Sequence, residues 1–215
     1  MDNKLCSVRN AVKSVFENST QRRYLEHTLR VYRFCEWIGV SEGANMDILL
    51  PAALLHDIGM TVDSGFPSHV DKSRLLGGWI LNNSGYDKPS IAKILKVACS
   101  HHPKPGVMLD TLEEKVLFDS DSMEIIGVFG LLRWIGKLPD SSTELISSIE
   151  MFLGMVEECS RARGSLFFTD TAKTMGSEAL MSTIETFERI RQYLSQFAQD
   201  SEKPLPFPFG SVGNV

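Results

Sequence analysis

Residues 52–60 read AALLHDIGM, and this stretch decides the fold because it places a histidine and an aspartate directly after an apolar run. The run has the composition of buried core, and Asp47 before it is a residue type that caps helices. Gly59 ends such a helix soon after His56 and Asp57. The pattern predicts a buried helix with two polar side chains at its C-terminal end.

Helical periodicity continues on both sides of this stretch. His27 shares one apolar stripe with Val31 and Ile38, so it is predicted to point inward. Further helices are predicted to start at Ser68, at Ser90 and at Thr111, which forms a capping-box pattern with Glu114. No segment alternates as a strand does, and the expected fold is all-α, a compact single-domain bundle of seven to nine helices. The predicted helices cover residues 24–39, 48–56, 69–85, 91–102, a segment after 111, 143–164 and 171–197.

Composition narrows the class of protein. A chain of 215 residues with 43% hydrophobic residues can fill one core, predicted over residues 1–200, with residues 201–215 as an extended proline-rich tail. A net charge of −5 gives no general attraction to nucleic acid or lipid surfaces. Four scattered cysteines, no signal peptide and no spanning segment favour a cytoplasmic protein that is not bound to membranes.

All five histidines lie between residues 27 and 102, at predicted helix ends or on an apolar helix face. A single histidine on such a face is usually a hydrogen-bonded core residue, but five near several aspartates are better explained by a shared metal. Imidazole and carboxylate donors suit divalent transition ions, namely Mn²⁺, Fe²⁺, Ni²⁺, Co²⁺ or Zn²⁺, and Mg²⁺ is a further candidate. The residues in question are His27, His56, His69, His101, His102, Asp57, Asp119 and Asp121.

The order of five motifs resembles the HD-domain superfamily of metal-dependent phosphohydrolases. The motifs are HTLRVYRFCEWIG, AALLHDIG, SHVDKSRLLGGWIL, ACSHHP and KVLFDSDSMEIIG, and they span about residues 20–135. The stretch LFFTDTAKTMGSEALMSTIETF resembles the closing helices of small stand-alone HD hydrolases, expected over about residues 141–198. The resemblance implies that a first metal is held by His27, His56, Asp57 and one aspartate of FDSDSMEIIG.

Two choices stay open within this resemblance. The alignment of SDSM favours Asp121 as the ligand, with Asp119 orienting a ligand, but helical phase does not separate the two aspartates. In members with two ions, histidines at the positions of His69 and His101 hold the second ion, with Asp57 bridging. In members with one ion, the same positions contact substrate phosphate or water. The sequence therefore predicts one or two ions.

The implied chemistry is metal-assisted hydrolysis of a phosphoester in a nucleotide or another small phosphorylated metabolite. Asp57, His69 and His101 are the candidate catalytic groups. The candidate substrate contacts are His102, Arg30, Lys72, Lys104 and Arg133, each of which lies near a motif. The expected partners are a small phosphorylated substrate and, in an oligomer, a second copy of the chain as a homodimer.

Two other function classes fit the same residues. A di-iron oxygenase could use the six ligands His27, His56, Asp57, His69, His101 and Asp121, and a non-catalytic binding module could use the metal for stability alone. Phosphate release, iron-dependent oxygen uptake, and ligand binding without turnover distinguish the three classes.

Overall fold

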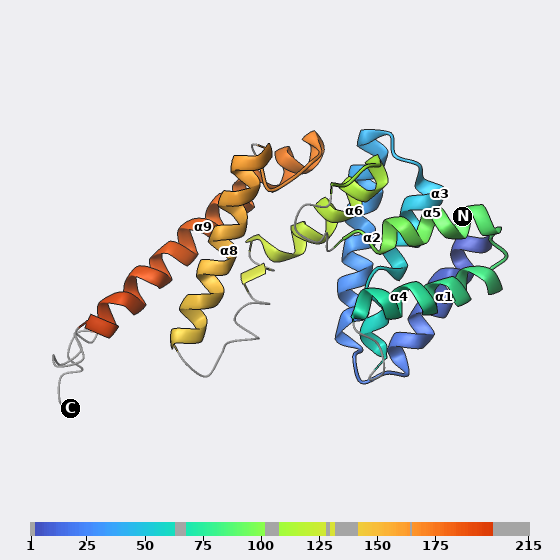
Figure 1. The fold of residues 1–215 in the computed structure, drawn as a ribbon, viewed down its shortest axis with the longest axis horizontal. Helices are drawn as coiled ribbons and strands as arrows, with labels where there is room; N and C mark the ends of the chain where they lie inside the picture. The colour runs from blue at the N-terminus through green and yellow to red at the C-terminus, as the bar shows by residue number, and fades with distance from the viewer. Residues whose placement is uncertain are drawn as a thin grey trace, which may run out of the picture.

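The computed structural model describes residues 3–62, 68–101, 108–127, 130–131, 142–163 and 165–199. These residues contain helices and connecting turns but no strand, which confirms the all-α fold. Figure 1 shows their arrangement. The α-helices are α1 (Asn3–Glu17), α2 (Arg23–Glu42), α3 (Met46–Leu55), α4 (His69–Asn83), α5 (Lys88–Ala98), α6 (Leu112–Ser122), α8 (Ser142–Arg163) and α9 (Asp170–Gln199). Two short 3₁₀ helices are η1 (Ile58–Thr61) and η2 (Met123–Ile125).

Helix α3 lies at the centre of the N-terminal helices and packs against α1, α2, α5 and α6. All its side chains from Leu49 to Leu55 are buried, as expected for a helix that is apolar all round. Only its C-terminal end, at His56 and Asp57, introduces polar groups into this interior. The central helix therefore places His56 and Asp57 in the middle of the bundle.

The helix starts agree with the predicted caps at two places and differ at two. Ser68 caps α4, and Thr111 forms a complete capping box with Glu114 at α6. Asp47 was expected to cap α3, but Asn45 does so, because its Oδ1 accepts from the Asp47 backbone N–H at 3.1 Å. At α5 the cap is Asp87, not Ser90: the Asp87 carboxylate accepts from the Ser90 backbone N–H at 2.9 Å. The sequence patterns did not predict α1.

Close contact between η1 and α4 fixes the segment after Asp57. A Cβ atom on Gly59 would lie 2.0 Å from the His69 carbonyl oxygen, so only glycine allows this approach. The Gly59 backbone N–H donates to Ser73 Oγ at 2.9 Å, and Ser73 Oγ donates to the His56 carbonyl at 2.8 Å. These contacts hold the first residue of α4, His69, beside the His-Asp turn.

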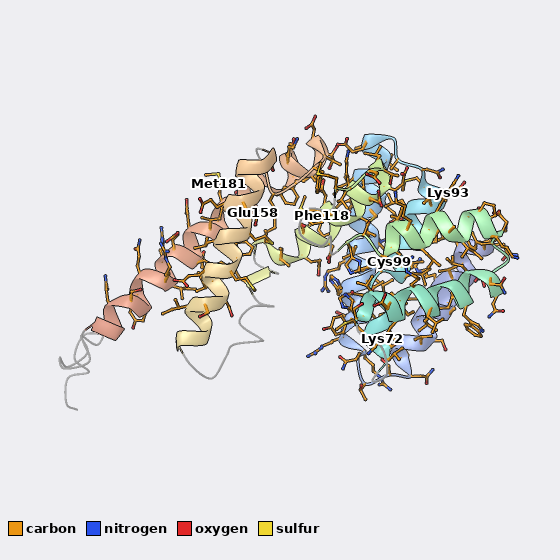
Figure 2. The ribbon with its side chains drawn as sticks, in the orientation of Figure 1. Lys72, Lys93, Cys99, Phe118, Glu158 and Met181 are labelled. Carbon is orange, nitrogen blue, oxygen red and sulfur yellow. The ribbon has the colours of Figure 1, made fainter. Side chains whose placement is uncertain are left out.

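Helices α8 and α9 pack side by side at one end of the molecule, next to α6 (Figure 1). Phe118 of α6, labelled in Figure 2, meets Phe168 edge to face with ring centroids 5.2 Å apart. The Thr171 backbone N–H at the start of α9 donates to Glu42 of α2 at 2.7 Å. The predicted tail at residues 201–215 lies outside the described residues. None of the described helices is long and apolar enough to cross a membrane.

Gly59 lies close against another helix, whereas Gly154 has open space around it, so alanine should have opposite effects on stability at the two positions. Gly59→Ala should lower the free energy of unfolding by about 1–3 kcal/mol, because the new methyl group overlaps the backbone of α4. Gly154→Ala is the matched control, since nothing lies within 4 Å of a Cβ there, and it should raise the free energy by about 0.5–1 kcal/mol through helix propensity. Urea denaturation measures both values, and a stabilising Gly59→Ala would contradict the close approach.

Candidate metal centre

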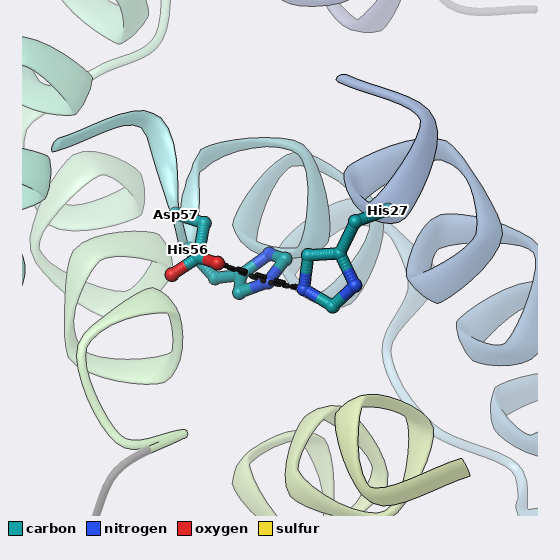
Figure 3. A group of neighbouring side chains, drawn as sticks. All are labelled: His27, His56 and Asp57. Atoms are coloured by element: carbon teal, nitrogen blue, oxygen red, sulfur yellow. Dashed lines mark hydrogen bonds and ion pairs between the residues drawn. The ribbon is translucent and has the colours of Figure 1, made fainter. Parts of the chain in front are cut away.

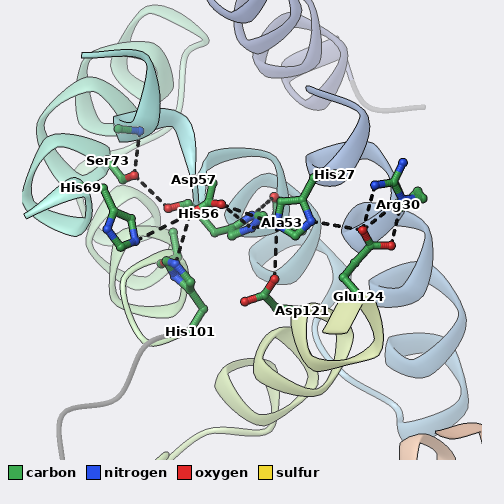
Figure 4. A network of polar contacts seen from close by, with 12 residues as sticks. His27, Arg30, Ala53, His56, Asp57, His69, Ser73, His101, Asp121 and Glu124 are labelled. Carbon is green, nitrogen blue, oxygen red and sulfur yellow. Dashed lines mark hydrogen bonds and ion pairs between the residues drawn. The ribbon is translucent and has the colours of Figure 1, made fainter. Parts of the chain in front are cut away.

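Side chains from five parts of the chain converge on one buried point (Figure 4). His27 comes from α2, the pair of His56 and Asp57 from the end of α3, and His69 from the start of α4. The other two groups, His101 after α5 and Asp121 in α6, complete the ring. The structure thus brings together all six predicted metal ligands. The predicted substrate contacts His102, Lys104 and Arg133 lie outside the described residues.

Asp57 stands between two pairs of histidines. Its Oδ2 lies 3.5 Å from His27 Nε2 and 3.8 Å from His56 Nε2. Figure 3 shows these three side chains together. Its Oδ1 lies 3.4 Å from His101 Nε2 and 3.7 Å from His69 Nε2. The ligand atoms therefore form two groups of three that share the Asp57 carboxylate.

Helix ends set the orientation of two of these imidazoles. His56 Nδ1 lies 2.8 Å from the Ala53 carbonyl and His101 Nδ1 lies 2.7 Å from the Ala98 carbonyl, three residues back in each case. Carbonyls in the last turn of a helix lack intrahelical donors, so an Nδ1–H donates to each of them. Both rings then present the lone pair of Nε2 to the centre.

The orientation of His27 is set by Glu124, a residue that the sequence patterns did not single out. Glu124 Oε2 lies 3.3 Å from His27 Nδ1, and Arg30 donates to both Glu124 oxygens at 2.9–3.0 Å. Carboxylates often orient metal-binding histidines in this way. Arg30, predicted to contact substrate phosphate, is thus paired with Glu124. The sequence spacing could have indicated this pair, because Glu124 follows Asp121 by three residues and Arg30 follows His27 by three, so each lies on the same helix face as a predicted ligand.

The spacing of the donor atoms fits a bound cation. Ligand atoms about 2.1 Å from an ion lie roughly 3.0–3.4 Å apart in octahedral or tetrahedral geometry. His27 Nε2 is 3.3 Å from both His56 Nε2 and Asp121 Oδ1, and most of the other separations are only slightly longer. Two imidazole lone pairs at such a distance repel each other unless a proton or a metal ion lies between them. The donor set therefore fits a divalent ion.

Burial and the close approach of carboxylates and imidazoles shift the pKa values in this centre. Burial acts to lower the pKa of His27, but hydrogen bonds with the carboxylates around it, Asp121 first, outweigh burial and raise the pKa to about 10. Burial lowers the pKa of His56 to about 4. Burial acts to raise the pKa of Asp57, yet the neighbouring histidines, His56 first, hold it well below its usual range. A proton on His27 thus supplies positive charge, and a metal ion must displace it, so binding weakens as the pH falls.

The two candidate aspartates of α6 have different surroundings. Asp121 Oδ1 faces His27 at 3.3 Å, whereas Asp119 is fully buried and binds the segment before α9. The Asp119 carboxylate accepts from the backbone N–H groups of Phe168 and Thr169 at 2.8 and 2.7 Å, and from the Thr169 hydroxyl at 2.7 Å. Asp119 therefore anchors the segment before α9, and Asp121 is the carboxylate that α6 presents to the centre.

One side of the centre is partly open. The side chains of His56 and His101 are fully buried, while those of His69 and Asp121 are 31% and 20% exposed. Lys72 lies one turn after His69 and donates to the Val62 carbonyl at 2.5 Å. A ligand can therefore approach from the side of His69 and Asp121.

Known proteins share the sequence pattern and the fold of this chain. The family model of the HD domain matches residues 24–126. A predicted HD superfamily hydrolase from an uncultured Thermotogales bacterium is 22% identical, with a TM-score of 0.57 over 88% of this chain and 91% of that chain. Lin1889 from Listeria innocua is 18% identical, with a TM-score of 0.59 over 95% and 100%. A Lactobacillus plantarum protein is 18% identical, with a TM-score of 0.63 over 94% and 98%. These structures share the fold, and no curated protein matches the chain.

Conservative variants of the two aspartates should separate anchoring from metal binding. Asp119→Asn should lower the free energy of unfolding by about 1–3 kcal/mol, because a buried charged acceptor of three hydrogen bonds is lost, and it should keep the bound metal. Asp121→Asn should instead weaken metal binding at least tenfold. Urea denaturation and metal titration measure the two effects. Metal loss in Asp119→Asn with none in Asp121→Asn would reverse the assignment.

Glu124 should act on metal affinity through His27. Glu124→Gln keeps the shape of the side chain but weakens the acceptor for His27 Nδ1–H, so metal affinity should fall about tenfold. Glu26→Gln is the matched control, because Glu26 also approaches Arg30, at 3.8 Å, but its side chain is 83% exposed. Competition with a chelator measures both affinities. Equal affinity in wild type and Glu124→Gln would show that Glu124 does not orient the ligand.

Proposed function

The chain belongs to the HD-domain superfamily through residues 24–126, and on this premise we propose that it is a metal-dependent hydrolase of small phosphorylated substrates. The observation that carries the proposal is the position of Asp57, one oxygen of which faces His27 and His56 while the other faces His69 and His101. Such a carboxylate can bridge two ions. We therefore assign two divalent ions to the protein, drawn from Mn, Fe, Co, Ni, Zn or Mg.

Bound divalent ions would lower the pKa of a coordinated water and neutralise charge that develops on a phosphoryl oxygen. The chain's own part is to hold and orient the reactants. Asp57 fixes the distance between the two histidine pairs, and the Ala53 and Ala98 carbonyls lock the imidazoles of His56 and His101. Burial of these groups excludes water from the inner side of the centre and strengthens its electrostatic interactions.

The open side of the centre, next to His69 and Asp121, is our proposed substrate entrance. An ammonium group has three donors, and the contact of Lys72 with Val62 uses one of them, so Lys72 can also donate to a phosphate oxygen. His102, Lys104 and Arg133 stay candidates for the other phosphate contacts because they lie near the same motifs in the sequence. The nucleotide or metabolite class of the substrate follows from the family resemblance and from the charge of these groups.

A metal and substrate panel tests the proposal. The purified chain, loaded in turn with Mn²⁺, Fe²⁺, Co²⁺, Ni²⁺, Zn²⁺ and Mg²⁺, should release phosphate or pyrophosphate from at least one nucleotide or sugar phosphate. His56→Ala should lose at least a hundredfold of this activity, because a ligand of the first ion is removed. Metal analysis should give two ions in the wild type and one in His69→Ala.

Cys99→Ala is the control for the metal count. Cys99 lies at the same end of α5 as His101, but its Sγ faces the Val70 carbonyl at 3.8 Å, so this variant should keep two ions. Two ions in His69→Ala would contradict the bridging role of Asp57. Iron-dependent oxygen uptake without phosphate release would identify a di-iron oxygenase, and ligand binding without either reaction would identify a binding module.

A further inference from the structure

A pocket lies between α1 on one side and α2 and α3 on the other. Its volume is about 410 Å³, which is within the range of small-molecule sites. None of the six proposed metal ligands lines it. Leu54 reaches it from α3, two residues before His56, so the pocket and the metal centre use different side chains near the end of the same helix. The pocket is therefore a separate feature of the N-terminal helices.

The two walls of this pocket differ in chemistry. Helix α1 supplies the apolar Val12 and four polar side chains, Cys6, Arg9, Asn10 and Lys13. Of these, Cys6, Arg9 and Lys13 follow one another at spacings of three and four residues, which places them on one helix face. The opposite wall is apolar and consists of leucine side chains from α2 and α3, namely Leu25, Leu29 and Leu54. A ligand that fits both walls must have an apolar body and a polar group.

The charge of the polar group follows from the wall on α1. No acidic side chain is among the described residues that line the pocket, although the whole chain carries a net charge of −5. The Arg9 guanidinium lies over the Tyr32 ring, 5.7 Å from its centroid, and this contact restrains it. Lys13 pairs with Glu17 at 3.7 Å, but both side chains are more than half exposed, so the pair is weak and an anion can compete for Lys13.

We propose that this pocket binds a small amphipathic anion, a carboxylate on a hydrocarbon chain. The carboxylate pairs with Arg9 and Lys13, and the chain lies against Leu25 and Leu29, with the fully buried Leu54 behind them. A longer hydrocarbon chain removes more apolar surface from water, so affinity should rise with chain length until the pocket is full. This site is independent of the proposed hydrolase activity.

Cys6 provides a readout located in the pocket. Octanoate should slow alkylation of Cys6 by N-ethylmaleimide at least fivefold in a saturable way, because the ligand covers the thiol. Cys99, labelled in Figure 2, is a half-buried cysteine outside this pocket and should react at an unchanged rate. Peptide mass spectrometry measures both rates in one sample. The neutral analogue 1-octanol should protect Cys6 at least fivefold less well than octanoate at equal concentration.

Charge variants complete the test. Arg9→Met should raise the octanoate concentration needed for half-protection at least fivefold, and Lys13→Met, an exposed position, serves if Arg9→Met does not fold. Lys93→Met removes an exposed lysine on α5, outside the pocket, and should leave protection unchanged. Three results would each overturn the proposal: no protection of Cys6 at saturating octanoate, equal protection by 1-octanol, or equal protection in the pocket variant and in Lys93→Met.

Discussion

The structure depends on one constraint, the burial of the Asp57 carboxylate among four imidazoles. A buried carboxylate is costly unless opposite charge or hydrogen-bond donors surround it, and here the surrounding groups are histidines that present nitrogen to its two oxygens. The arrangement is favourable only when positive charge is shared among these groups. Protons on the imidazoles can supply that charge, and a metal ion supplies it better, because it also satisfies several lone pairs at once.

Groups at the surrounding helix ends hold the imidazoles around Asp57 in place. The last-turn carbonyls of α3 and α5 orient two imidazoles, and Glu124 with Arg30 orients a third. Ser73 joins the turn after α3 to α4 through two hydrogen bonds, and the lack of a side chain at Gly59 allows the elements to meet. These groups lie outside the set of ligands, yet they fix where the ligands point.

The sequence predicted the features that depend on local pattern. Apolar periodicity predicted most helices, and the clustering of histidines with HDIG predicted which side chains come together, although His102 lies outside the described residues. Contacts between distant segments were not predictable in this way. Glu124 and Arg30 are 94 residues apart, and the link of Asp119 to residues 168–169 spans about 50 residues. The cap of α3 was misassigned for a local reason, since Asn45 and Asp47 are both good capping residues and only the backbone angles of the native turn select Asn45.

The anchoring of α9 has a mechanical consequence. This helix has 30 residues and is therefore about 45 Å long, and the segment at its start is held to α6 through Asp119. Asp121, which faces His27, lies only two residues further along α6. The long helix is thus fixed to the bundle within one helical turn of the residue that faces His27. The position of α9 and the position of the Asp121 carboxylate therefore depend on the same short stretch of α6 backbone.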